Sequence, residues 1–225
     1  MLQGDGEAPI VWVGSSLSDL RALPDAAKQD VGFQLEQVQF GRDPDDWKPM
    51  SSVGSGCREI RVRTAEGAFR TFYVTKFDEC VYVLHVFTKK TQTTSARDIE
   101  MGRRRYGEAA EIARERRDQK GWQAMSVWDD ITDSPAEAAN MKVRSALMRA
   151  VRDRIEAFGW SQTVAAANLG VTQPRVSELM TGKVSRFSLD ALVAMGDKVG
   201  VHVTVSVDTP DEHPEVAVPK RMMHR

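Results

Sequence analysis

The apolar residues in the first half of the chain change from helical to strand spacing. A short apolar run at 9–13 precedes two stretches, opening at Ser16 and Pro24, whose apolar residues recur every three or four positions. Runs rich in Val, Ile, Phe and Tyr follow, with brief polar breaks between them, at 57–63, 68–76 and 80–87. A charged helix is expected at 94–118. This order predicts an α+β unit in which a small antiparallel sheet packs against helices.

The second half of the chain keeps helical spacing almost throughout. Residues 134–137, Ser-Pro-Ala-Glu, form a capping box, and amphipathic helices are expected at 141–158 and 189–198. The alternation of apolar and polar residues at 201–207 predicts a strand. It needs a partner strand from a second copy of the chain or from the first half of this one. We therefore expect a first unit at 1–118, a linker at 119–133, an all-helical second unit with a C-terminal strand at 134–207, and a tail at 208–225.

Residues 158–187 have the pattern of a helix-turn-helix. Ser161 is placed to cap a short helix, Gly170 to form the turn, and Thr172 to cap a second helix. The start of that second helix enters the major groove of DNA in such motifs, and its outward-pointing side chains are Gln173, Arg175 and Ser177. An ordinary three-helix bundle with a solvated polar face is the alternative.

Composition narrows the class of protein. The hydrophobic fraction of 41% and the charged fraction of 28% are those of a globular protein. No apolar run is long enough to span a membrane and the first residues lack the order of a signal peptide, so we expect a cytoplasmic protein. Cys57 and Cys80 lie far apart in strand-like runs and are expected to be free thiols. We expect no metal and no cofactor. The net charge of −1 leaves nucleic-acid binding open, since such a protein need only be basic locally.

Residues 126–207 resemble the HigA-type antitoxins of the Xre family. The run LGVTQPRVSELMTGK, the FSLDAL helix and the leading VWDDI segment carry the resemblance. It implies a homodimer that binds operator DNA, represses its own promoter and neutralises a partner toxin. It also implies phosphate contacts from Gln162 and Thr172, base contacts from Gln173 and Arg175 with Ser177 nearby, and backbone contacts from Lys183, Ser185 and Arg186.

Residues 8–118 resemble the RelE/HigB superfamily of ribonuclease toxins, in its phage-related branch. The elements CREIRV, AFRTFYV, VYVLHVFTKKTQTT and ARDIEMGRRRY carry the resemblance. It implies metal-independent cleavage of mRNA, usually on the ribosome. Cations are needed to stabilise the phosphorane formed by 2′-OH attack, and His85 titrates near neutrality. The catalytic candidates are Arg61, Arg70, His85, Lys89 and Lys90, and the RNA-binding candidates are Arg63, Arg103, Arg104 and Arg105.

Each of these residues also has a structural interpretation. His85 shares its strand face with apolar residues and is equally a core histidine, and Lys89 and Lys90 are equally a solvated strand end. Arg103–Arg105 fit a solvated helix face, and the arginines around Glu59 fit cross-strand pairs. Residues 1–124 hold equal numbers of basic and acidic residues, whereas toxins of this family are typically basic.

The sequence therefore leaves three hypotheses. The first is a toxin and its antitoxin fused on one chain, with a contact between them that is intramolecular or domain-swapped; Met125 falls where a separate antitoxin would start. Trp122, Val127, Trp128 and Ile131 are then expected to dock on the first unit, although they would equally cover the core of the second. The second hypothesis is a DNA-binding regulator with a degenerate toxin domain. The third is a gyrase-poisoning toxin of the ParE branch, which the array of cations disfavours.

Overall fold

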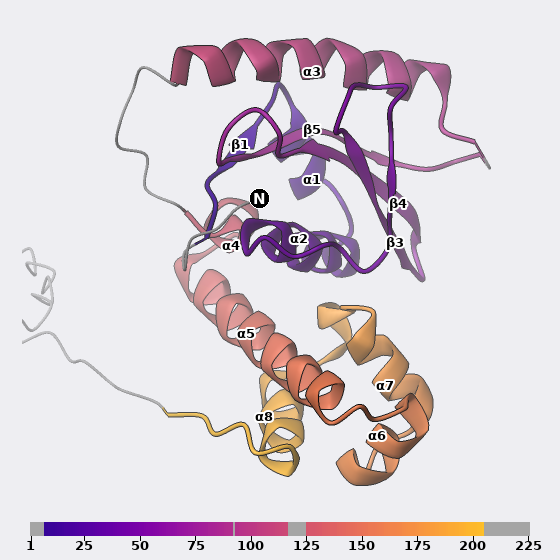
Figure 1. The fold of residues 1–225 in the computed structure, drawn as a ribbon, viewed down its shortest axis with the longest axis vertical. Coiled ribbons are helices and arrows are strands. Elements are labelled where there is room, and N and C mark those ends of the chain that lie inside the picture. The colour runs from indigo at the N-terminus through magenta and orange to yellow at the C-terminus, as the bar shows by residue number, and fades with distance from the viewer. Residues whose placement is uncertain (1–6, 92, 117–124, 205–225) are drawn as a thin grey trace, which may run out of the picture.

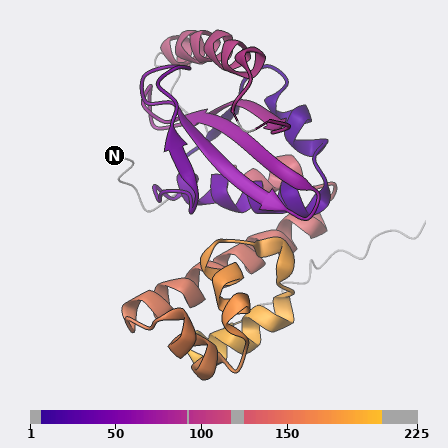
Figure 2. The same cartoon turned by 90° about the vertical axis from the view of Figure 1, so that its right-hand side faces the viewer.

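The computed structural model describes residues 7–91, 93–116 and 125–204. Its elements are stacked in layers, with helix α3 above a sheet, helix α2 below the sheet, and the helical second unit below α2 (Figure 1). A view from the side shows the same order, with the sheet above and the second unit beneath it (Figure 2).

The first unit contains the helices and strands that its residue pattern predicts, and in addition a short strand, β2, where composition indicates a loop. In chain order they are β1 (Ile10–Trp12), α1 (Ser16–Arg21), α2 (Asp25–Gln39), β2 (Trp47–Pro49), β3 (Arg58–Thr64), β4 (Gly67–Val74), β5 (Val81–Thr88) and α3 (Ala96–Arg116).

The five strands are arranged in the order β1-β5-β4-β3-β2. Strands β3, β4 and β5 form the predicted antiparallel meander, but β1 pairs in parallel with β5. The sheet is therefore mixed, and the prediction of a purely antiparallel sheet is wrong. Helices α1 and α2 and strands β2 to β4 lie between β1 and β5 in the sequence. A connection of this length allows β5 to lie beside β1 in the parallel direction.

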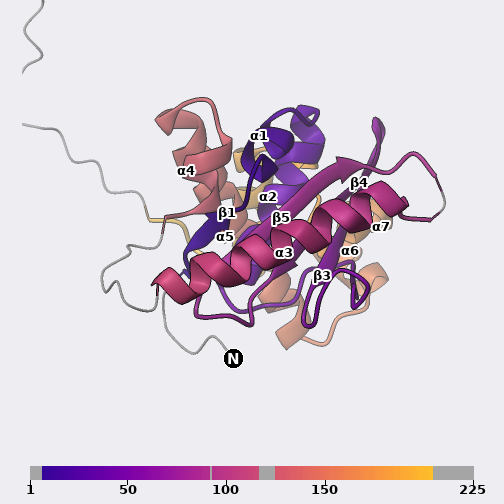
Figure 3. The same cartoon turned by 90° about the horizontal axis from the view of Figure 1, so that it is seen from above.

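Each face of the sheet packs against a different helix. The face toward α2 carries Ile60, Phe69 and Val83 among its buried residues, and the face toward α3 carries Phe72 and Leu84. Helix α3 runs across the second face when seen from above (Figure 3). Both cysteines are buried and free, as expected.

The second unit is helical, and its helices start at the predicted caps. Its elements are α5 (Pro135–Ala157), α6 (Gln162–Leu169), α7 (Gln173–Met180), the short 3₁₀ helix η1 (Val184–Arg186) and α8 (Leu189–Lys198). The side chains that accept a backbone N–H at the start of α5, α6, α7 and α8 are Ser134, Ser161, Thr172 and Ser188. Gly170 has the left-handed φ of 65° that the turn requires.

The strand predicted at 201–207 is not observed in the residues that the structure describes there. Residues 201–204 have no regular secondary structure, and the backbone N–H of Val201 bonds instead to the carbonyl of Gly196 at 2.8 Å. Residues 205–207 lie outside the described part. A strand exists only where another strand completes its hydrogen bonds, and none of the described strands lies beside this segment.

The predicted linker contains a buried helix, α4 (Val127–Ile131), which contacts α2 of the first unit and α5 of the second. Val127, Trp128 and Ile131 are buried there, so these three dock on the first unit as expected while also covering the second; Trp122 lies outside the described residues. The contact depends on Gly32 of α2. A β-carbon at this position would lie 2.5 Å from Cδ1 of Ile131 and 2.8 Å from Cζ3 of Trp128.

Apolar residues of both units form one continuous core, which includes Phe33 and Leu35 of α2 and Leu179 and Phe187 of the second unit. Polar contacts surround it. Arg42 pairs with Asp153 at 2.8 Å, and the N–H of Ser185 donates to Asp30 at 3.0 Å. Two further ion pairs join Arg149 to Glu36 and Arg152 to Asp45. We call this contact between the two units the seam.

Burial raises the pKa of Glu36 from its ordinary value of 4.5 to about 7, because desolvation outweighs the attraction of Arg149. A carboxyl group with a higher pKa in the folded chain binds more protons when folded. Its contribution to stability is therefore complete below pH 4.5 and is lost as the pH rises toward 7.

We therefore expect Glu36→Gln to change how stability varies with pH. Glutamine resembles protonated glutamate, so the variant and the wild type should be similar at low pH. Between about pH 5.5 and 7.5 the free energy of unfolding of the wild type should fall by on the order of 1–2 kcal/mol more than that of the variant. Urea unfolding at both pH values measures the difference, with the exposed Glu111→Gln as the control. An equal pH dependence in Glu36→Gln and wild type would contradict the raised pKa.

Candidate functional site

A cleft of about 440 Å³ opens where β5 ends and α3 begins. It brings together three of the catalytic candidates, His85, Lys89 and Lys90, with the RNA-binding candidate Arg105. All the residues that line it belong to the first unit, and it lies on the α3 side of the sheet. The second unit packs against α2 on the opposite side, so it does not cover this cleft (Figures 1 and 3).

His85 lies at the inner wall of the cleft, with a side chain that is 12% exposed. One ring nitrogen, Nε2, lies 3.1 Å from Oδ1 of Asp98, and the other, Nδ1, lies 3.5 Å from Arg105. Burial lowers the pKa of His85, and the hydrogen bond to Asp98 opposes that shift without cancelling it. The ring is therefore neutral at pH 7, which a proton acceptor requires.

Arg105 is buried and holds this corner of the first unit together. Its guanidinium donates to the carbonyl of Leu84 at 3.0 Å and to Oγ of Ser15 at 2.5 Å, and lies 3.5 Å from Asp19. It is thus placed to orient His85 rather than to grip RNA at the surface.

Arg103 and Arg104 are exposed on α3, outside the set that lines the cleft. Arg103 pairs with Glu100 and donates to the carbonyl of Ser52, and Arg104 pairs with Glu108. Their predicted role in RNA binding requires a ligand that extends beyond the cleft along the helix.

Three cations lie at the mouth of the cleft: Lys89, Lys90 and Arg97. Within the described residues, none of them has a carboxylate partner within 4.0 Å. Desolvation and the nearby positive charge of Arg70 lower the pKa of Lys89. These three cations therefore gather at the cleft without an ion-pair partner among the described residues, although Asp19 and Asp98 line the same cleft. Unpaired cations are what a phosphate-binding surface requires.

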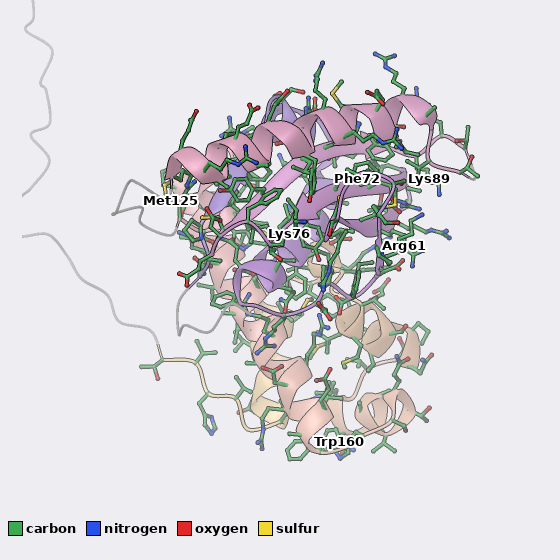
Figure 4. The ribbon with its side chains drawn as sticks, turned by 45° about the horizontal axis from the view of Figure 1, so that its top comes forward. Arg61, Phe72, Lys76, Lys89, Met125 and Trp160 are labelled. Atoms are coloured by element: carbon green, nitrogen blue, oxygen red, sulfur yellow. The ribbon has the colours of Figure 1, made fainter. Side chains whose placement is uncertain are left out.

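Strand register places Arg61 directly opposite Arg70, and Arg70 opposite Phe87, on the face that also carries His85. Figure 4 shows Arg61 and Lys89 toward the same end of the first unit. The strand register thus places Arg61, Arg70 and His85 on one face of the sheet, but these candidates do not line one common cleft, and they differ in access. Arg70 is 3% exposed and pairs at 3.3 Å with Glu59, which is fully buried. Arg70 therefore lies beneath the exposed surface of this face of the sheet. Its role as a phosphate clamp stays a prediction.

The ion pairs of the other arginines on β3 are not the cross-strand pairs that the sequence suggested. Arg58 pairs with Asp43 at 2.7 Å and Arg61 pairs with Asp46, so both meet loop carboxylates rather than strand neighbours. Arg61 and Arg63 line a different cleft, at the seam.

The residues that sequence reasoning missed are Asp98, Asp19 and Arg97. Asp98 is the partner of His85, and Ser95 and Asp98 form a cap at the start of α3 in which Oγ of Ser95 accepts the N–H of Asp98 at 3.1 Å. The Ser-x-x-Asp spacing was a readable signal for that cap. Nothing in the sequence indicated that the cap would lie against β5.

In the second unit, Gln162 and Gln173 are exposed and bonded to each other, with Nε2 of Gln173 donating to Oε1 of Gln162 at 2.5 Å. The bond uses one N–H of Gln173 and leaves its second N–H and its carbonyl oxygen free. Those two groups match the N7 and N6 edge of adenine. Thr172 is exposed beside them, with its hydroxyl accepting the N–H of Arg175 as the cap of α7.

Arg175 does not project outward as the pattern predicted. Its guanidinium donates to the carbonyl of Arg186 at 2.6 Å and pairs with Glu178 at 3.1 Å. It also lies 3.8 Å above the ring of Phe187. These contacts hold it along the end of α7, so base reading by Arg175 stays a prediction that requires it to turn outward.

The remaining DNA-binding candidates, Ser177, Lys183, Ser185 and Arg186, line two clefts at the seam, and Arg186 is exposed there. They lie farther along the motif than Gln162 and Gln173. The described residues include no cluster of three or more potential metal ligands. The helices of residues 7–91, 93–116 and 125–204 are all too short or too polar to cross a membrane.

Comparison with protein families agrees with this division. The family described as phage derived protein Gp49-like matches residues 18–107, and the family described as helix-turn-helix domain matches residues 130–208. No protein of curated function shows significant similarity to the chain. The first match covers strands β2 to β5 and most of the cleft, but not β1, and the second covers α5 to α8, whose helix-turn-helix implies DNA binding. The chain thus joins, on one polypeptide, a Gp49-like domain of the RelE/HigB-like toxin family and a helix-turn-helix domain.

Proposed function

We propose that the chain is a toxin–antitoxin module on one polypeptide. Its first unit is a metal-independent endoribonuclease that acts on mRNA, and its second unit binds operator DNA and represses its own promoter. The observation that carries the proposal is the cleft in which the His85–Asp98 pair lies among Lys89, Lys90 and Arg97.

RNA supplies its own nucleophile in this reaction. The 2′ oxygen forms a bond to the adjacent phosphorus while the bond from phosphorus to the 5′ oxygen breaks. The 2′-OH loses its proton to a base, the leaving 5′ oxygen takes a proton from water, and the products are a 2′,3′-cyclic phosphate and a 5′-hydroxyl. Negative charge grows on the phosphoryl oxygens between these events, so fixed cations lower the barrier.

Each group in the cleft has a place in this reaction. Neutral His85 is the proton acceptor through Nδ1, because its Nε2–H donates to Asp98, and Arg105 lies 3.5 Å from Nδ1 and orients the ring. Lys89, Lys90 and Arg97 hold the phosphate, because no carboxylate neutralises them. The buried Glu59–Arg70 pair keeps β3 and β4 in register below the phosphate.

The open cleft affects how the second unit restrains the first. Because the second unit does not cover the cleft, restraint in the intact chain does not occlude the catalytic groups. The added bulk on the α2 side is the feature that can keep the first unit from a large substrate such as the ribosome.

The test of ribonuclease action uses the purified full-length chain with a short single-stranded RNA and, separately, with translating ribosomes. We expect cleavage that persists in EDTA and leaves cyclic phosphate ends. Lys89→Ala/Lys90→Ala should reduce the rate roughly 10²-fold by removing phosphate stabilisation. His85→Ala should reduce it by at least roughly 10²-fold by removing the base.

The control for these variants is Arg114→Ala, which removes an exposed cation from the far end of α3. Melting temperatures show that each variant is folded. Absence of cleavage in both assays by a chain that binds DNA would leave the DNA-binding regulator with an inactive toxin domain. DNA breaks in the presence of gyrase would instead support the ParE-like alternative.

For the second unit, a preferred duplex is first selected from a random-sequence library with the full-length chain. We expect Gln173→Ala to weaken binding to that duplex roughly tenfold or more, because a two-point contact to one base is lost. Binding to unrelated duplexes should hardly change. Asn140→Ala removes an exposed amide from α5 and is the matched control. Equal binding of the selected duplex by Gln173→Ala and wild type would exclude Gln173 from base reading.

A further inference from the structure

A continuous groove runs along the seam, formed by two adjoining clefts of about 280 Å³ and 360 Å³. Both clefts are lined by Asp30 and Arg63 of the first unit and by Lys183 of the second. One end of the groove is lined by Ser177 of α7 and by Thr181, which directly follows α7, and the other reaches Arg186 and the turn between β3 and β4. We call it the seam groove.

The seam groove contains cations without partners. Elsewhere at the seam, carboxylates and arginines are matched, as in the Glu36–Arg149 and Asp45–Arg152 pairs. Among the described residues, by contrast, no carboxylate lies within 4.0 Å of the charged groups of Arg63, Lys183 or Arg186.

The carboxylates that line the groove beside these three cations are held by other groups. Asp30 accepts the backbone N–H of Ser185, and Glu66 accepts the hydroxyl of Thr64. At the end near Ser177, Asp45 and Asp46 are engaged by Arg152 and Arg61. Three cations from two units therefore line one cleft, and an anion bound there would form ion pairs with them.

The groove is continuous with the base-reading side of α7. Gln173, Ser177 and Thr181 are spaced four residues apart, so they lie along one side of the helix. Gln173 is exposed at the start of this row, and Ser177 and Thr181 reach the groove. A helix in the major groove is flanked by the phosphates of both strands, and phosphate contacts fix its register. The seam groove lies where one of these phosphate rows would pass.

We propose that the seam groove binds the DNA backbone, and that Arg63 of the toxin-family unit contacts phosphate together with Lys183 and Arg186 of the helix-turn-helix unit. The proposal rests on the proposed DNA binding through α7. It moves Arg63 from the RNA-binding set to the DNA-binding surface, since Arg63 lines the seam groove and is absent from the lining of the catalytic cleft. The first unit then contributes to DNA affinity directly, without any part in reading the sequence.

The experiment measures binding of the full-length chain to a labelled, mixed-sequence DNA duplex of about three helical turns. Fluorescence anisotropy is recorded across roughly 50 to 200 mM salt. We expect Arg63→Ala to weaken binding roughly threefold to tenfold at low salt and to reduce the slope of log K against log salt by about one. Arg63→Lys should restore most of the affinity, because a phosphate contact needs the charge more than the guanidinium shape.

Arg114→Ala is again the matched control, since it removes the same charge from the first unit at a distance from the seam. Should Arg63→Ala behave as Arg114→Ala does while Lys183→Ala weakens binding, the first unit has no part in DNA contact and the inference fails, although DNA binding by the second unit stands. A wild-type chain that binds no duplex would overturn the proposed DNA-binding function itself. Tighter binding of the DNA duplex by Arg63→Ala would also overturn the inference. So would an Arg63→Ala variant that binds an RNA duplex less well than wild type while its binding to the DNA duplex is unchanged.

Discussion

The burial of helix α2 on all sides is the constraint on which the rest of the structure depends. Its apolar residues pack under the sheet, as for any helix of an α+β unit, yet Lys28, Gln34, Glu36 and Gln37 are buried as well. They are buried because α4 and the second unit cover the side that would otherwise face solvent. Burying polar groups is costly unless they are paired, and here Arg149 pairs with Glu36 and the backbone N–H of Ser185 donates to Asp30. The second unit thus completes a helix that belongs to the first.

This docking fixes where each functional surface lies. With α2 covered by the second unit, the cleft on the α3 side stays open, and the segment around η1 lies beside the turn between β3 and β4. The same contact therefore leaves one candidate nucleic-acid surface free and builds part of another. Gly32 is essential to this geometry, since any side chain there would push Trp128 and Ile131 away from α2.

Much of the fold was predictable because local signals dominate it. Period-two runs gave β3 to β5, and the caps at Ser134, Ser161, Thr172 and Ser188 gave the helix starts, each through a hydrogen bond within four residues. The parallel strand β1, the burial of Lys28 and Glu36, and the absence of a strand at 201–204 were not predictable in this way. Each depends on a partner many residues distant, or on the lack of one. The candidate site divides likewise: alternation placed Arg61, Arg70 and His85 on one face, but only tertiary contacts show that Arg70 is buried and that Asp98 meets His85.

A shared core changes what regulation can mean for this chain. Separate proteins exchange partners by dissociation, but a tether holds the two units at an effective concentration in roughly the mM range. Separating them would also expose the buried polar side of α2 and the apolar side of α4. Control by release is therefore energetically unfavourable. A ligand that favours one geometry of the seam needs no such separation, and DNA bound in the proposed seam groove would be a ligand of this kind. If RNA bound in the proposed cleft changes the seam, reciprocity requires DNA bound at the seam to change the affinity for RNA by the same factor.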